Sequence, residues 1–171
     1  MAHPDGVDRI TEQWHRERPD LDTTAMAVFG RIYRLARIAG DEGERAYADF
    51  GIGRAEFDVL ATLRRSGEPY ELSPGALAAS MMLSTGGTTA RLDRLEKAGL
   101  AERRPSPSDR RGVLVRLTPK GIDVVDRAVA AGLARQQSLL SHLSPADRRR
   151  LSDLLRAALE PHEGQGTARG S

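Results

Sequence analysis

Cysteine is absent from this 171-residue chain, and aromatic residues make up only 4% of it. Without cysteine there are no disulfides, no thiolate metal sites, no nucleophilic cysteine and no thiol-based redox sensing. No apolar run reaches the roughly 18 residues of a membrane-spanning helix, and the first residues lack the basic-then-apolar order of a secretion signal. We therefore expect a cytoplasmic globular protein with no membrane contact.

Motifs of common enzyme chemistry are also missing. Gly51-Ile52-Gly53 continues as Arg54-Ala55-Glu56, which fits neither a phosphate-binding loop nor a dinucleotide-binding fingerprint. No Gly-x-Ser-x-Gly nucleophile elbow occurs. The histidines are scattered without metal-ligand spacing, at His3, His15, His142 and His162. We expect no catalysis, no cofactor and no metal ion.

Charge is distributed unevenly along the chain, although its net value is only +2. The segment from Ser84 to Lys120 holds nine basic and four acidic residues, a net +5, which leaves −3 for the remainder. A basic segment on an acidic body indicates a localised contact with a polyanion.

Apolar periodicity and helix-start signals predict a mainly helical chain. Three helices are expected to begin with a hydroxyl N-cap followed by proline, at Ser73-Pro74, Thr118-Pro119 and Ser144-Pro145. From residue 161 to 171 we expect a disordered tail. The expected helices are Ile10–Arg18, Thr23–Asp49, Arg54–Arg65, Pro74–Ser80, Ser84–Ala98, Pro119–Leu140 and Pro145–Leu159.

One segment departs from the helical pattern. Leu100–Arg104 and Val113–Leu117 are strand-like, and the residues between them are rich in turn formers and arginine. Two short helices followed by such a hairpin describe a winged helix-turn-helix. The predicted fold class is therefore mainly α with a small β-hairpin wing.

In this fold the second short helix enters the major groove of DNA with its N-terminal turns. Small hydroxyl side chains there allow close approach to base edges. An exposed hairpin tip also collects charge without any function, so the helix, the wing and the charge asymmetry together favour DNA binding. The expected contacts are Ser84, Thr85, Thr88 and Thr89 for bases, with Arg94, Arg110 and Arg111 for phosphate or the minor groove.

Three consecutive motifs carry a family resemblance. They are LDRLEKAGL at 92–100, SDRRG at 108–112 and VRLTPKG at 115–121, and together they resemble the MarR family of repressors over about residues 22–159. The resemblance implies a homodimer that reads a pseudo-palindromic operator. It assigns residues 1–50 and 119–160 to N- and C-terminal dimerisation helices, and residues 51–118 to the DNA-binding domain.

A more specific likeness lies near the N-terminus. Trp14 and the stretch Glu17–Asp22 resemble the urate-responsive PecS/HucR-like branch, which implies a ligand site at Trp14, Asp58, Arg91 and Arg103. A flat purine anion suits an indole face and guanidinium donors. An arginine would neutralise Asp58 in the free protein, and the incoming anion would compete for it.

Each of these four residues also has a purely structural interpretation. A single tryptophan on an amphipathic helix usually packs, Asp58 can cap or pair, and Arg103 can contact phosphate or solvent. We predict a homodimeric repressor that urate or a related purine anion releases from its operator. The alternatives are the same repressor with a phenolic or drug-like ligand, and an architectural DNA-binding protein with no ligand.

Overall fold

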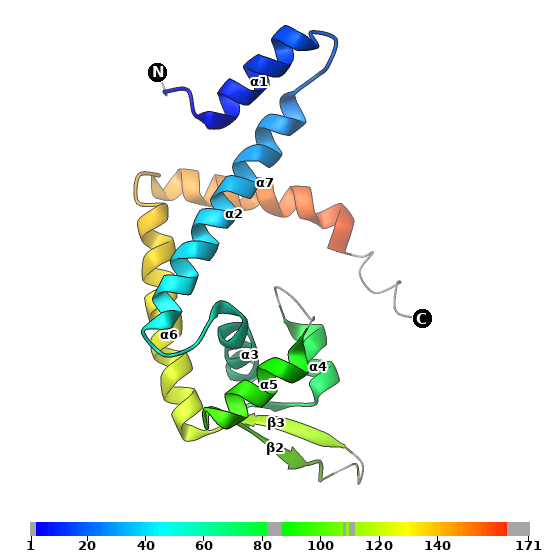
Figure 1. Ribbon diagram of the computed structural model, residues 1–171, viewed down its shortest axis with the longest axis vertical. Helices are drawn as coiled ribbons and strands as arrows, with labels where there is room; N and C mark the ends of the chain where they lie inside the picture. Colours follow the sequence, from blue (N-terminus) through cyan, green and yellow to red (C-terminus); the bar gives the residue numbers. More distant parts are fainter. Residues whose placement is uncertain (1–2, 82–86, 108, 110–111, 164–171) are drawn as a thin grey trace. The chain divides into compact units, whose positions relative to one another are not determined.

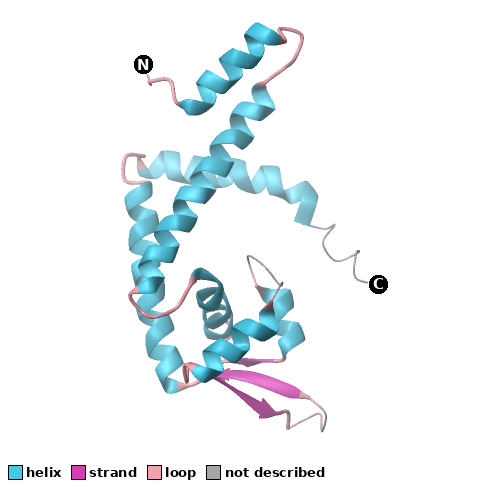
Figure 2. Cartoon of the chain, in the orientation of Figure 1, coloured by secondary structure: helices cyan, strands magenta, loops and turns pink. Residues whose placement is uncertain are grey.

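The computed structural model describes residues 3–81, 87–107, 109 and 112–163, and helices dominate it (Figures 1 and 2). The predicted fold class, mainly helical with a small β wing, is confirmed. The helices are α1 (Gly6–Glu17), α2 (Thr24–Ala48), α3 (Arg54–Arg65), α4 (Pro74–Ser80), α5 (Thr88–Lys97), α6 (Pro119–Leu139) and α7 (Pro145–Glu163). The strands are β1 (Glu71–Leu72), β2 (Ala101–Pro105) and β3 (Val113–Leu117).

Local capping explains where several helices begin. Ser73 Oγ accepts a hydrogen bond from the Ala76 amide at 3.2 Å, so α4 begins at Pro74 as predicted. Helix α1 begins at Gly6, four residues earlier than Ile10, because Asp5 and Asp8 form a reciprocal capping box. Short acidic caps of this kind precede any apolar periodicity, and periodicity alone misses them.

Two other helix ends differ from the prediction. Helix α5 begins at Thr88 and not at Ser84, because its N-cap, Gly87, adopts a left-handed conformation with φ 72°. Helix α7 continues past Pro161 to Glu163, so the expected tail begins too early. A proline in the final turn removes only one donor from the helix ladder. Residues 164–171 lie outside the described part of the chain.

The sheet has three strands in the order β1-β3-β2, all antiparallel. The β2–β3 hairpin was predicted, and its register pairs Ala101 with Leu117 and Pro105 with Val113. The two-residue strand β1 was not predicted, because it is too short to show alternation and pairs with β3 more than 40 residues away. Strand β3 is therefore central and carries buried Val115 and Leu117.

The core of the winged unit is aliphatic. Leu60 and Leu63 of α3, Leu77 of α4 and Leu95 of α5 are fully buried against β3 and Val125 of α6, and each such side chain stabilises the fold by about 2 kcal/mol. Tyr47 of α2 stacks on Phe57 of α3, with ring centroids 3.9 Å apart. These contacts fix α3 and α5 as neighbours, and the candidate site lies between them.

Contacts divide the chain into two compact units, residues 1–135 and 136–171, with the division inside α6. The expected dimerisation region concerns contacts between two copies of the chain, and it therefore stays a prediction. No helix in the described ranges is long and apolar enough to cross a membrane.

Candidate ligand and DNA interface

The first turn of α5 carries two of the predicted base contacts. Thr89 is exposed and Thr88 is half-buried. The left-handed Gly87 directs the chain into this turn, where the helix dipole also favours an anion such as phosphate. Ser84, Thr85, Arg110 and Arg111 lie outside the described residues.

The wing is a β-hairpin whose strands are connected by residues 106–112. The Ser106 amide donates to the Gly112 carbonyl, and the Gly112 amide donates to the Asp109 carbonyl, both at 2.9 Å. Figure 2 shows the β2–β3 hairpin projecting from the helices, as a wing that reaches along DNA must. The predicted arginines, Arg110 and Arg111, follow Asp109 in the sequence.

Arg94, predicted as a phosphate contact, is bound to α3 in this structure. Its Nη2 and Nε lie 2.5 and 2.7 Å from Glu56 Oε1. Burial alone would raise the pKa of Glu56, but hydrogen bonds from Arg94 and the Gly53 amide, with the charge of Arg94, hold it below its ordinary value. The Arg94 side chain remains more than half exposed, so the pair joins α3 to α5 at the protein surface.

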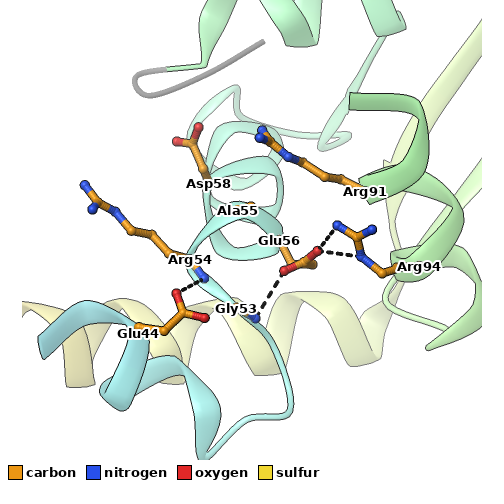
Figure 3. Close-up of a pocket in the computed structure, with 8 residues that line it drawn as sticks. All are labelled: Glu44, Gly53, Arg54, Ala55, Glu56, Asp58, Arg91 and Arg94. Carbon is orange, nitrogen blue, oxygen red and sulfur yellow. Dashed lines mark hydrogen bonds and ion pairs between the residues drawn. The ribbon is translucent and has the colours of Figure 1, made fainter. Parts of the chain in front are cut away.

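A pocket of about 430 Å³ opens at this junction (Figure 3). That volume falls in the range of small-molecule sites, about 300–1,000 Å³. Two of the four predicted ligand residues, Asp58 of α3 and Arg91 of α5, line it together. The complete lining is Glu44, Gly53, Arg54, Ala55, Glu56, Asp58, Arg91 and Arg94.

Asp58 has an unusual environment for a carboxylate. Its residue is 6% exposed, and its Oδ2 has no hydrogen-bond partner among the described residues. The ion pair expected with a neutralising arginine is not formed within the described chain, although Arg91 faces the same pocket. Buried carboxylates normally have donors, so a carboxylate without one in a pocket wall offers an acceptor to a ligand.

Arg103 lies elsewhere. Its guanidinium is 2.6 Å from both Asp93 and Glu96 of α5, and its amide also donates to Glu96. The hydrogen bond with Asp93 raises the pKa of Arg103. Since successive helix residues rotate by about 100°, Asp93 and Glu96 lie on the side of α5 opposite Arg91. Within one chain, Arg103 clamps β2 to α5 and does not line the pocket.

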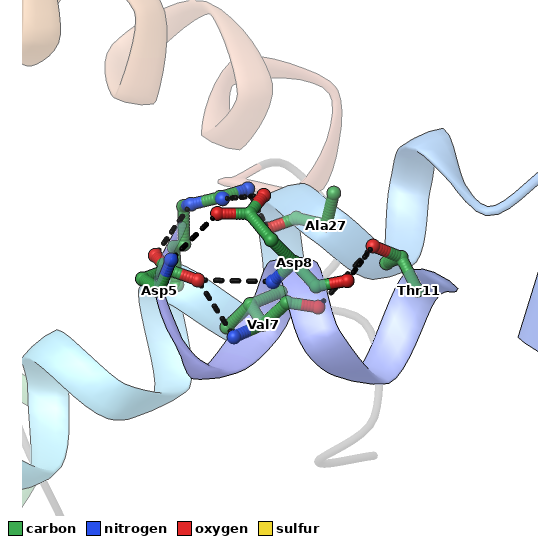
Figure 4. A network of polar contacts seen from close by, with 6 residues as sticks. Asp5, Val7, Asp8, Thr11 and Ala27 are labelled. Carbon is green, nitrogen blue, oxygen red and sulfur yellow. Dashed lines mark hydrogen bonds and ion pairs between the residues drawn. The ribbon is translucent and has the colours of Figure 1, made fainter. Parts of the chain in front are cut away.

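Trp14 is also separate from the pocket. It lies on α1 and is 43% exposed. Helix α1 is held to α2 by Arg31, which contacts Asp5 at 3.0 Å and Asp8 at 2.5 Å, and by Val7, which packs over Gly30. Figure 4 shows Asp5 and Asp8 within this network of polar contacts. The structure thus brings Asp58 and Arg91 together but neither Trp14 nor Arg103 with them.

Three charged lining residues, Glu44, Arg54 and Glu56, were not among the predicted site residues. Arg54 is one helical turn before Asp58, and that i,i+4 spacing was a signal that could have found it. Glu56 meets Arg94 across 38 residues of chain, which no local pattern reveals. Among the described residues no cluster of three histidine or acidic side chains could hold a metal ion.

Comparison with known proteins agrees with this geometry. A family model described as "MarR family" matches residues 50–112. The chain is 37% identical to the HTH-type transcriptional regulator PecS of Dickeya dadantii, covering 91% of this chain and 93% of PecS. That likeness therefore extends over both the winged unit and the flanking helices.

Solved structures show the same fold. A MarR C80S mutant from E. coli complexed with operator DNA has a TM-score of 0.69 and 28% identity, covering 80% of this chain and 97% of that one. The organohalide-sensing regulator RdhR-CbdbA1625, bound to 2,4-dichlorophenol, has a TM-score of 0.75 at 17% identity, covering 87% and 86%. The chain therefore belongs to the MarR family: it is a DNA-binding transcription regulator with a winged helix-turn-helix, and not an enzyme.

Proposed function

We propose that this regulator is a homodimeric repressor that leaves its pseudo-palindromic operator when urate or a related purine anion binds. The observation that carries the proposal is the α3–α5 pocket, which is lined by the buried carboxylate of Asp58 from α3 and by Arg91 from α5. Asp58 Oδ2 has no hydrogen-bond partner among the described residues. One wall of this pocket is the recognition helix itself. A ligand that draws on Arg91 therefore acts directly on the element that reads DNA.

The homodimer is supported by apolar residues that one chain leaves exposed. On α2, Phe29 and Tyr33 are 53% and 68% exposed, with Met26 on the same side of the helix. On α7, Leu154 and Leu159 are 61% and 56% exposed. Exposed apolar surface on both terminal regions is typical of a subunit interface. Two recognition helices related by a two-fold axis would read two half-sites about one helical turn apart.

For DNA, the proposal assigns base contacts to Ser84, Thr85, Thr88 and Thr89, and contacts with phosphate or the minor groove to Arg94, Arg110 and Arg111. To contact phosphate directly, Arg94 would have to leave Glu56. Otherwise it would act through its ion pair with Glu56, which joins α5 to α3. For the ligand, it assigns direct contacts to Asp58 and Arg91. Trp14→Phe and Arg103→Gln test whether the other two residues belong to the same site.

The test is a gel-shift titration on the DNA upstream of the protein's own gene, with and without urate. The proposal expects a discrete complex that resists competitor DNA, dissolves with urate, and no longer dissolves in Asp58→Asn. A discrete complex that only 2,4-dichlorophenol dissolves would favour a phenolic ligand, as the RdhR-CbdbA1625 structure suggests. A smear removed by competitor DNA would favour an architectural protein.

A further inference from the structure

The side chain of Arg54, the first residue of α3, makes no polar contact among the described residues that would give it a role in the fold. Its backbone amide donates to Glu44 Oε2 at 2.9 Å, which caps the helix. Its half-buried guanidinium makes no hydrogen bond or ion pair with any described residue. Instead it lines the α3–α5 pocket and passes over Gly40 of α2, where an added Cβ would lie 2.7 Å from Nη1.

Arg54 and Asp58 are one turn apart on α3, the spacing at which opposite charges usually pair on a helix. They do not pair here, and Asp58 Oδ2 is left without a donor among the described residues. The Arg54 guanidinium and the Asp58 carboxylate, whose Oδ2 is buried, thus belong to residues that line the same cavity. Neither group has a hydrogen-bond partner among the described residues.

Arg91 completes the arrangement from α5. In Figure 3 the Asp58 carboxylate lies between the guanidinium groups of Arg54 and Arg91. The wall therefore presents donor, acceptor and donor in that order. Its complement is a planar edge with oxygen, N–H and oxygen in that order, as in a cyclic imide, a ring N–H flanked by two carbonyls.

We infer that Arg54 is a ligand-binding residue that, with Asp58 and Arg91, selects planar heterocycles bearing an imide edge. Resting on the proposed function, the inference adds a residue and a chemical class to that site. Urate carries such an edge at N1–H, between the carbonyls at C2 and C6. A benzoate offers no hydrogen-bond donor to Asp58, and a phenol offers a single O–H without an acceptor on each side of it for the two arginines, so the site discriminates against both.

The test measures dissociation constants by isothermal titration calorimetry of the full chain with urate and with 1-methylurate, in which a methyl group replaces the imide hydrogen. We expect 1-methylurate to bind the wild type about tenfold or more weakly than urate, the usual loss for one charged hydrogen bond. Arg54→Gln should weaken urate by a similar factor while the operator affinity stays unchanged.

Gly40→Ala provides a second variant that keeps the charge. Its methyl group displaces only the flexible end of Arg54, so the fold is retained and urate binding weakens. Arg45→Gln is the matched control, because Arg45 is exposed on α2, pairs with Glu42 and does not line the pocket. Its urate affinity should equal that of the wild type.

The outcomes distinguish a failure of this inference from a failure of the proposed function. If Arg54→Gln and Gly40→Ala both bind urate like the wild type, the role of Arg54 is wrong while the proposed function stands. If 1-methylurate and urate bind equally, the imide edge is wrong. If the wild type binds neither compound, the purine ligand of the proposed function fails and takes this inference with it.

Discussion

Glu56 shows how one side chain serves both the local helix and the site. Its carboxylate accepts from the Gly53 amide at 3.2 Å, which closes the first turn of α3, and also from Arg94 of α5. The side chain is only 16% exposed, whereas that of Arg94 is 58% exposed. The pair is thus half-screened by solvent, and it holds the recognition helix on α3 at modest strength.

Replacing Glu56 by glutamine should lower the free energy of unfolding by about 1 kcal/mol at neutral pH, since an ion pair of this exposure contributes that much at most. The pKa of Glu56 is held below its ordinary value of 4.5, so its stabilisation is complete above that pH. The contribution is lost as pH falls through the lower pKa of the folded state. Urea unfolding of wild type and Glu56→Gln at several pH values measures the difference, which should shrink below about pH 4.5.

Arg37→Gln is the control for this measurement, because Arg37 pairs with Asp41 on the exposed surface of α2 at 3.7 Å. Its effect should be near zero at every pH. A Glu56→Gln difference that stays constant down to pH 3 would show that the charge of Glu56 contributes nothing.

Elements join closely where β3 leads into α6. Thr118 Oγ1 accepts from the Gly121 amide and donates to the Gly99 carbonyl, and Lys120 Nζ donates to the Ala98 carbonyl at 2.9 Å. Gly121 lies directly against the backbone of Leu100, where a Cβ would overlap the Leu100 carbonyl oxygen. The end of α5, the wing and α6 therefore meet with no room for a side chain.

Gly121→Ala should destabilise the fold by about 2 kcal/mol or more, because backbone on both sides has to shift. Gly75→Ala is the matched control: nothing lies within 4 Å of its Cβ position on α4. There alanine should be neutral or stabilise by up to about 1 kcal/mol, as helix propensity dictates. Thermal unfolding of both variants checks the contrast, and equal melting temperatures would contradict it.

Among the described residues, Arg31 is the α2 side chain that makes hydrogen bonds and ion pairs with α1. Arg31 bonds both Asp5 and Asp8, and the pKa of each carboxyl is lowered, first by backbone hydrogen bonds of the capping box and also by Arg31. We expect Arg31→Gln to loosen α1 while leaving the winged unit folded. The protection factors for amide hydrogen exchange in residues 6–17 should fall, and acid that protonates the two carboxyls should lower the protection factors of the wild type in the same way. Unchanged exchange would assign the docking to Val7 alone.

Elements differ in how well their sequence predicts them, for physical reasons. Helix α4 was predicted to the residue because a serine cap and a proline act within one turn. Helix α5 begins later than predicted because its start depends on the left-handed Gly87 and not on periodicity. Strand β1 exists only through its pairing with β3. The same holds in the site: Asp58 and Arg91 were named through a family resemblance, whereas the Glu56–Arg94 pair depends on tertiary packing.

On the scale of the whole molecule, α2 presents apolar residues on more sides than one chain covers. Helix α1 packs along Gly30 and Arg31, which leaves Phe29 and Tyr33 exposed on one flank, with ring centroids 6.0 Å apart, and Val28 and Leu35 on the other. Exposed apolar surface of this extent on a helix is typical of an interface with a partner. The proposed dimer would bury it and would also set the distance between two recognition helices.

Phe29→Glu should therefore convert the proposed dimer to a monomer, since two carboxylates would be buried in a two-fold interface without partners. Analytical ultracentrifugation gives the mass directly. A monomer engages one half-site at a time, so operator affinity should fall about 100-fold or more, as it does when two linked contacts become one. Arg16→Glu, an exposed change on α1 outside this apolar flank, is the charge control and should remain dimeric. A Phe29→Glu protein that stays dimeric and binds the operator normally would place the interface elsewhere, and the apolar flank of α2 would then need another partner.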